Sequence, residues 1–179
     1  MKRLQLRFEN IQEIVGGDHL SVIMLTDEAR KRAISLICDE VMTHQILMRL
    51  QARDTCKNML PEALVGMLPG QYEMMIYGVH DGQYQVVLAD KEFEKSQRIR
   101  ISDAILLSII SGYPIYIEET LMNQQSMPFE EHARGVAIPI NTMDKKRLNF
   151  ALEQAIHNEN YELASKLRDE IKRREATKK

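Results

Sequence analysis

Tryptophan is absent from this 179-residue sequence, and cysteine occurs only twice, as Cys38 and Cys56. The two cysteines form neither a CxxC pair nor a metal-ligand spacing with histidine, which predicts reduced, packed thiols in a cytoplasmic protein. The basic N-terminal segment lacks the apolar core of a secretory signal, so none is expected. The longest apolar stretch, Ala104 to Ile110, is far too short to span a bilayer. No membrane partner is therefore expected.

Hydrophobic residues, by contrast, make up 44% of the chain, and methionine occurs 11 times. This length and composition predict one domain of ordinary size with a small appendage. The net charge of −2 is unevenly divided. From Asp144 onward there are 10 basic and 7 acidic residues, whereas the remainder has 14 and 19. An acidic main domain is not typical of a protein that binds nucleic acid only through its phosphate backbone.

Alternating and apolar segments predict strands in the first third of the chain. Leu4, Leu6 and Phe8 alternate with polar residues, and Leu20 to Leu25 and Arg32 to Ile37 form a predicted hairpin. Gly16 to Asp18 predicts a turn. Asp39 is then expected to cap a helix that reaches about Gln51. Its expected inner residues are Val41, Ile46, Leu47 and Leu50.

A short helix, a hairpin and a β–α–β unit are predicted next. The short helix has Pro61 in its first turn and Leu60, Leu64 and Met67 on one face. Tyr72 to Val79 and Tyr84 to Leu88 flank Asp81-Gly82, a favourable hairpin turn. Strand residues 98–101 then precede a helix that should be buried on most sides around 104–110. Gly112 and Pro114 end that helix, and Ile115 to Ile117 forms the next strand.

The corner between residues 98 and 103 is the part of this unit with chemical potential. It places Arg98, Arg100 and Asp103 where a strand meets a helix N-terminus, and free N–H groups at such a terminus can bind phosphate. The other interpretation is structural: Ser102 or Asp103 caps the helix and the arginines are solvated. Spacing alone favours the structural interpretation.

The last part of the chain changes in character. Asn123 to Gly135 is polar and predicts a linker or a lid. From Asp144 onward, charged segments with helical spacing of Leu148, Leu152 and Ala155, and of Ala164, Leu167 and Ile171, predict an αα-hairpin. The fold class is therefore α+β, with a mixed or antiparallel sheet of β-hairpin–helix modules followed by this hairpin. The expected division is a domain at 1–122, a linker at 123–142 and a helical hairpin at 143–176.

The segment Ser21 to Met122 resembles the bifunctional nuclease domain, a bacterial and plant family described as having DNase and RNase activity. The resemblance rests on Arg100 to Ile105, RISDAI, followed by Pro114 to Ile117, PIYI. The family motif has an arginine, any residue, Ser-Asp-Ala and then a Pro-Ile strand, and Ile101 stands where many members have proline. This resemblance implies a nucleic-acid partner and phosphodiester hydrolysis. It does not by itself identify the catalytic residues.

The segment Leu148 to Arg174 resembles the UVR motif, a helical hairpin shared by subunits of the nucleotide-excision-repair nuclease. The resemblance rests on the Asn160-Tyr161-Glu162 turn and the run Leu167 to Ile171. That motif is a protein–protein interaction element, so it implies a partner that carries a UVR motif or acts in repair. The expected partner-binding residues are Leu148, Leu152, Tyr161, Leu167 and Arg168.

Phosphodiester hydrolysis usually requires carboxylates on a divalent metal, a polarised water and a cation near the phosphate. We therefore predict Arg100, Asp103 and Asp27 as catalytic residues, with Arg98 and Ser102 binding substrate. The candidate metal ligands for Mg²⁺ or Mn²⁺ are Asp27, Asp103 and Glu118. No known nuclease signature organises these residues, and solvation or capping stays open for each carboxylate.

Two classes of function thus remain after the sequence has been considered. The first is a metal-dependent nuclease for DNA or RNA that is docked to partners by the hairpin. The second is a non-catalytic binding or regulatory module with a UVR adaptor, in repair or proteostasis complexes. In either case, apolar strand edges and a methionine-rich surface predict a homo-oligomer.

Overall fold

The computed structural model of the chain describes residues 2–13, 20–68, 70–92, 94–131 and 140–177. They form two compact units. Unit 1 contains Met1–Gly78 and Tyr84–Ala137, and unit 2 contains Val79–Gln83 and Ile138–Lys179. The turn predicted at Gly16 to Asp18 lies outside the described residues.

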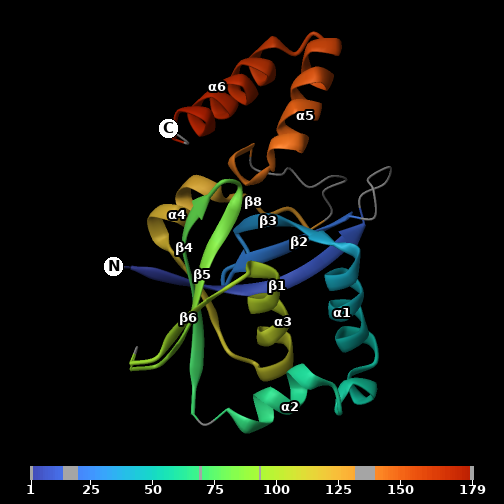
Figure 1. Ribbon diagram of the computed structural model, residues 1–179, viewed down its shortest axis with the longest axis vertical. Helices are drawn as coiled ribbons and strands as arrows, with labels where there is room; N and C mark the ends of the chain where they lie inside the picture. Colours follow the sequence, from blue (N-terminus) through green and yellow to red (C-terminus); the bar gives the residue numbers. More distant parts are fainter. Residues whose placement is uncertain (1, 14–19, 69, 93, 132–139, 178–179) are drawn as a thin grey trace. The chain divides into compact units, whose positions relative to one another are not determined.

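Eight described strands form one mixed sheet in the order β6-β5-β4-β7-β1-β2-β3-β8 (Figure 1). Their bounds are β1 Arg3–Glu13, β2 Leu20–Asp27, β3 Arg32–Asp39, β4 Tyr72–His80, β5 Gln83–Asp90, β6 Ser96–Ile99, β7 Ile115–Glu118 and β8 Met127–Pro128. β4 and β7 pair in parallel, whereas β1–β2, β1–β7, β2–β3, β3–β8 and β5–β6 are antiparallel. The predicted α+β class is therefore confirmed.

The predicted β–α–β unit joins strands that are not neighbours. β6 leads into α3 (Ile101–Ser111), which returns the chain to β7, and β5 and β4 lie between the two strands in the sheet. Gly112 ends α3 in the left-handed conformation, at φ 77°, and its N–H donates to Ser108, as the sequence predicts. Ala104 and Ile105 of this helix are buried and its other residues are partly buried, so none is fully exposed, as expected for a helix covered on most sides.

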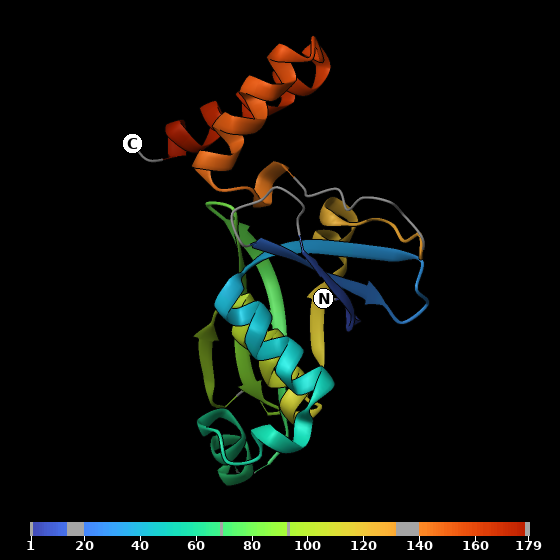
Figure 2. The same ribbon diagram turned by 90° about the vertical axis from the view of Figure 1, so that its right-hand side faces the viewer.

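Helix α1 (Glu40–Gln51) begins where the sequence predicts, because the Asp39 carboxylate accepts a hydrogen bond from the Met42 N–H at 2.8 Å. It packs against α3, and the two helices lie side by side in Figures 1 and 2. The prediction of its inner face is wrong in part. Val41 is 74% exposed and Leu50 48%, whereas Thr43, Ile46 and Arg49 are buried. Polar partners therefore determine the buried face of this helix.

Arg49 is the centre of a buried clamp between α1 and α2 (Leu60–Met67). Its Nε and Nη2 donate to the two carboxylate oxygens of Glu62 at 2.7 and 2.9 Å, and its Nη1 donates to the Gln45 carbonyl at 2.9 Å. The short 3₁₀ turn Arg53–Cys56 connects the two helices. No residue of α2 is buried, and the face formed by Leu60, Leu64 and Met67 is exposed.

The core of unit 1 lies between the sheet and these helices. Fully buried side chains come from the strands and from α1, α3 and α4: Ile23, Leu25, Ile34, Ile46, Met74, Ile76, Ile105, Ile117 and Met122. Cys38 and Cys56 are buried free thiols, as the sequence predicts. Burial raises the pKa of the Cys38 thiol, which favours its protonated form.

The expected linker at 123–142 begins with ordered structure. Helix α4 (Glu119–Gln125) buries Leu121, Met122 and Gln125, and β8 pairs with β3 through Met127 and Ala33. Residues 123–128 are thus part of unit 1. The polar composition of this stretch gave no sign that Gln125 is buried and that Met127 pairs in the sheet. Residues 132–139, which include most of the predicted extended piece at 136–140, lie outside the described residues.

Unit 2 contains the predicted αα-hairpin. After a 3₁₀ turn, Ile140–Thr142, helices α5 (Lys145–His157) and α6 (Tyr161–Thr177) pack together around Leu148, Ala155, Ala164 and Leu167. Asp144 caps α5 by accepting from the Arg147 N–H, and Asn160 accepts from the Leu163 N–H. The turn between β4 and β5 also belongs to this unit. Among the described residues, no helix is both long and apolar enough to cross a membrane.

Candidate functional site

The corner at the start of α3 is built around Arg100. Its backbone is extended, at φ −72° and ψ 150°, and it precedes the helix without any side-chain cap. The prediction that Ser102 or Asp103 caps this helix is therefore wrong. Asp103 lies inside the first turn instead and accepts from Arg100 Nε at 2.7 Å and Nη2 at 2.9 Å. The Arg100 side chain is still 73% exposed.

The start of α1 lies near the same corner. The pKa of Arg100 is raised by the hydrogen bond and charge of Asp103, with a smaller contribution from the charge of Asp39. Asp39 and Arg100 thus mark two helix N-termini that approach each other where α1 packs on α3. Helix N-termini and a guanidinium favour an anion, whereas the two carboxylates oppose one. Asp103 occupies the Nε and Nη2 groups of Arg100, so an incoming phosphate has to use the remaining N–H donors of the guanidinium.

Asp27, the third predicted catalytic residue, lies elsewhere. Strand register pairs Leu20 with Asp39, so Asp27 is at the other end of β2, about 23 Å from that pairing. The carboxylate is mostly buried, and it accepts from the Lys31 and Arg32 N–H groups at 2.8 and 3.2 Å and from Arg32 Nε at 3.3 Å. These bonds hold the turn between β2 and β3. The structure therefore separates Asp27 from the Arg100 corner.

Glu118 completes the predicted metal ligands, at the end of β7. Leu6 of β1 pairs with both Asp27 and Ile115, which places the backbones of Asp27 and Glu118 about 14 Å apart across the sheet. Within the described parts of the chain, no three His, Cys, Asp or Glu side chains are grouped so as to hold a metal ion. With the oxygens of Asp27 and Asp103 already engaged, the predicted donors do not fit a resident Mg²⁺ or Mn²⁺.

A hollow in the sheet lies on the strand that leads to Arg100. It has a volume of about 470 Å³ and is lined by Tyr77 of β4, Val87 of β5, and Ser96, Gln97 and Arg98 of β6. Arg98 was predicted as a substrate-binding residue from the sequence, whereas Tyr77 was not. The available signal was the alternation of Met74 and Ile76 in β4, which places the aromatic ring of Tyr77 on the opposite, outer face.

In unit 2, the predicted partner-binding residues divide into two groups. Leu148 and Leu167 are buried inside the hairpin and Leu152 is partly buried, so they hold the two helices together. Tyr161, which is 69% exposed, and Arg168 lie on the outside, where a partner can reach them. The expected antiparallel packing of Leu148 and Ala155 against Ala164 and Leu167 is confirmed.

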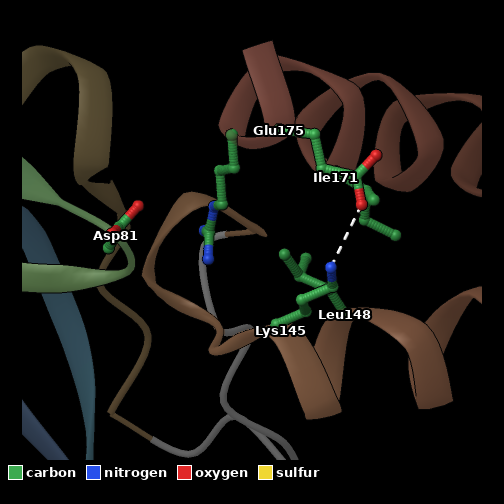
Figure 3. A pocket seen from close by; sticks show the side chains of 6 residues that line it. Asp81, Lys145, Leu148, Ile171 and Glu175 are labelled. Atoms are coloured by element: carbon green, nitrogen blue, oxygen red, sulfur yellow. Dashed lines mark hydrogen bonds and ion pairs between the residues drawn. The ribbon is translucent and has the colours of Figure 1, made fainter. Parts of the chain in front are cut away.

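A small pocket of about 180 Å³ also lies within unit 2 (Figure 3). It is lined by Asp81, Lys145, Leu148, Ile171, Arg174 and Glu175, and an ion pair of 3.1 Å joins Lys145 on α5 to Glu175 on α6. Arg174 donates to the Met143 carbonyl at 2.6 Å. This volume is below that of ordinary ligand pockets. The ion pair and this hydrogen bond instead join the beginning of α5 to the end of α6.

Comparison with known families gives two matches. A family model of the bifunctional nuclease domain matches residues 22–130, and the UvrB/UvrC (UVR) motif matches residues 145–176. The curated proteins contain no match to this chain. The first match contains the Arg100 corner, the sheet hollow and the Asp27 turn, and the second coincides with α5 and α6. Since the first match covers more than half of the 179 residues, the chain belongs to the bifunctional nuclease domain family and carries a UVR motif after that domain.

Proposed function

We propose that this protein hydrolyses phosphodiester bonds of DNA or RNA at the Arg100 corner. The observation that carries the proposal is the exposed Arg100 guanidinium at a helix start, within the part of the chain that matches the nuclease family. A planar guanidinium binds phosphate oxygens in a bidentate manner and neutralises the charge that develops during displacement. Asp103 holds that guanidinium in position before the substrate arrives.

Hydrolysis also requires a group that takes a proton from the attacking water. We assign this role to Asp39, an exposed carboxylate whose charge acts on Arg100. Asp27 is assigned a structural role, because its oxygens hold the β2–β3 turn. The expected dependence on Mg²⁺ or Mn²⁺ is tested by the same cleavage assay.

The test is cleavage of fluorescent DNA and RNA oligonucleotides by the full chain, in EDTA and with added Mg²⁺ or Mn²⁺. Arg100→Ala should reduce the rate at least 100-fold, the size typical of losing one charge-stabilising group. Asp103→Asn should also reduce it while the melting temperature changes little, because an exposed ion pair contributes roughly 0–1 kcal/mol. A matched loss of activity and stability would make Asp103 a structural residue.

Arg7→Ala is the matched control for this assay. Arg7 is an exposed arginine that forms an exposed ion pair with Glu28. In the strand register it lies opposite Thr26, at the end of β2 that is distant from Asp39. Its replacement should leave cleavage unchanged. Equal cleavage by the wild type, Arg100→Ala and Arg7→Ala would reveal a contaminating nuclease and would contradict the proposal.

The second candidate is a non-catalytic binding module with a UVR adaptor. It is favoured by the engaged oxygens of Asp27 and Asp103 and by the absence of a three-donor group among the described residues. Oligonucleotide binding without turnover, whichever metal is added, would support this alternative and not the nuclease.

The UVR hairpin is proposed to bind a protein that itself carries a UVR motif, such as a repair subunit. The exposed Tyr161 and Arg168 are the residues we assign to that contact. Titration with a purified UVR-bearing repair subunit should give binding that Tyr161→Ala or Arg168→Ala weakens. Unchanged binding by both variants would place the contact elsewhere on the hairpin.

A further inference from the structure

The hollow on the outer face of β4, β5 and β6 is open and chemically mixed. Arg98 and Val87 are direct partners in the antiparallel register of β5 and β6, so their side chains lie on one face of the sheet. Tyr77 is 37% exposed at the same hollow. The volume of about 470 Å³ lies within the range of small-ligand sites, and it is enough for one nucleobase.

Tyr77 is an aromatic ring available for stacking. Its outward neighbour Tyr116, which lies beside Met75 in the β4–β7 register, is already covered by the Arg3 guanidinium at 4.3 Å. No ring or cation among the described residues covers Tyr77 in this way. A half-exposed aromatic ring on a sheet is the platform on which proteins stack unpaired bases, because every base offers a π face.

Arg98 supplies a cation at the edge of the same hollow. It is exposed, and within the described residues it has no acidic partner, unlike Arg100. Ser96 and Gln97 add donors and acceptors that can reach the edge of a base. The backbone stays extended from β6 through Arg100, which places Arg98 and Arg100 about 6.6 Å apart along the chain.

We propose that this hollow binds one unstacked base of a single-stranded nucleic acid, with the base on Tyr77 and its phosphate on Arg98. The next phosphate along the strand then meets Arg100, a step that rests on the proposed nuclease function. A duplex cannot occupy the site without unstacking, since its bases have no free π face. The acidic balance of the residues before Asp144 also disfavours binding of a duplex through its phosphates alone.

The test is fluorescence anisotropy of the full chain with labelled oligothymidylate, oligouridylate and a duplex of equal length, all in EDTA. The single strands should bind more tightly than the duplex. Tyr77→Ala should weaken single-strand binding about 5- to 150-fold, whereas Tyr77→Phe, which keeps the ring, should stay close to the wild type. Arg98→Ala should weaken binding and lower the salt slope by about 0.7.

Two control variants separate stacking from general effects. Phe150→Ala removes a 63% exposed aromatic ring from α5, and Arg7→Ala removes an exposed arginine from unit 1; neither should change binding. Equal affinity for duplex and single strand, or unchanged binding by Tyr77→Ala, would overturn the proposal. Binding that depends on Tyr77 without any cleavage would contradict the proposed nuclease function and support the base-binding site. Cleavage that depends on Arg100 but not on Tyr77 would support the proposed nuclease function and contradict the base-binding site.

Discussion

The carboxylate of Asp27 stabilises the folded state through hydrogen bonds within the β2–β3 turn. Burial by itself would raise its pKa, but hydrogen bonds from the Lys31 and Arg32 N–H groups and from the Arg32 side chain outweigh burial. The net effect lowers the pKa below its ordinary value of 3.8. Asp27 therefore stabilises the folded state fully above that value, and the contribution is lost as the pH falls through the lowered pKa.

This linkage gives a prediction for Asp27→Asn. The variant should melt at a lower temperature than the wild type at pH 6–7, and the two melting temperatures should converge as the pH falls from 3.8 through the lowered pKa of Asp27, where the folded carboxylate becomes protonated. Asp54→Asn is the control, because the Asp54 side chain is 90% exposed and should show no such convergence. A difference that stays constant down to pH 2.5 would contradict the assignment.

The N-capping residue could be predicted from the sequence for α1 but not for α3. Asp39 is the last residue of β3 and caps α1 as its sequence indicates. The similar run Ile101-Ser102-Asp103 does not, because β6 ends earlier, at Ile99, and α3 begins at Ile101. A shift of two or three residues in the helix start thus converts the expected cap into an ion-pair partner of Arg100. Local sequence gives the presence of a helix more reliably than its first residue.

At the scale of elements, the Arg49–Glu62 clamp determines how α2 is held. The Arg49 side chain is only 2% exposed and that of Glu62 16%, so removing Glu62 leaves a buried guanidinium without its main partner. Glu62→Ala should therefore lower the free energy of unfolding by about 3 kcal/mol, at the low end for breaking a buried pair because Glu62 is not fully buried. Urea unfolding measures this change.

Glu28→Ala is the matched control for the clamp. Glu28 forms an ion pair with Arg7, but the Glu28 side chain is 59% exposed and the Arg7 side chain 61%. Its loss should cost less than about 1 kcal/mol. Equal effects of the two substitutions would mean that the clamp does not hold α2 in solution.

The clamp also explains why the buried face of α1 could not be predicted from hydrophobicity. Arg49 is inside because Glu62, 13 residues away, is there to receive it, and Thr43 is inside because its hydroxyl donates to the Asp39 carbonyl. Local patterns did predict the β4–β5 hairpin, where Asp81 and Gly82 have the positive φ values of a tight turn. Pairings between distant strands, such as β4 with β7, leave no local signal and were not predicted.

At the scale of the whole molecule, α2 presents an outward apolar stripe that we expect a second copy of the chain to cover. The stripe consists of Leu60, Ala63, Leu64 and Met67, at helical spacings of three and four residues, and all four are exposed. Glu62, the only charged residue of α2, is turned toward Arg49. An uncharged stripe can meet its own copy across a two-fold axis without like-charge repulsion.

This stripe gives a test of the predicted homo-oligomer. Because an eight-residue helix is only about 12 Å long, the contact is small and the dimer should be weak and concentration-dependent. Light scattering at rising concentration should show a mass increasing from 20.8 kDa toward twice that value. Leu64→Glu should abolish the increase, whereas Val41→Glu, at an exposed site on α1, should not. A wild type that stays at 20.8 kDa at high concentration would remove this idea.

The final prediction concerns the independence of the two units. Among the described residues, α5 and α6 pack in a core of their own around Leu148, Ala155, Ala164 and Leu167, and both belong to unit 2. The β4–β5 turn can form without the hairpin, because Asp81 and Gly82 already have the conformation that it needs. Deletion of residues 144–179 should therefore leave unit 1 folded, with its urea midpoint and oligonucleotide binding retained and its binding to a UVR-bearing protein abolished.

A point variant provides the matching experiment in the full chain. Leu167→Ala removes a fully buried side chain from the hairpin, and such a cavity typically costs about 2–5 kcal/mol. Two short helices with so small a core cannot absorb that loss, since helices of this length are marginal without tertiary contacts. The variant should reproduce the truncation: unit 1 unfolds at its usual urea concentration, while the hairpin signal and partner binding disappear. If the truncated chain instead fails to fold, the hairpin is part of the main core, and the division of the chain into a domain and an adaptor is wrong.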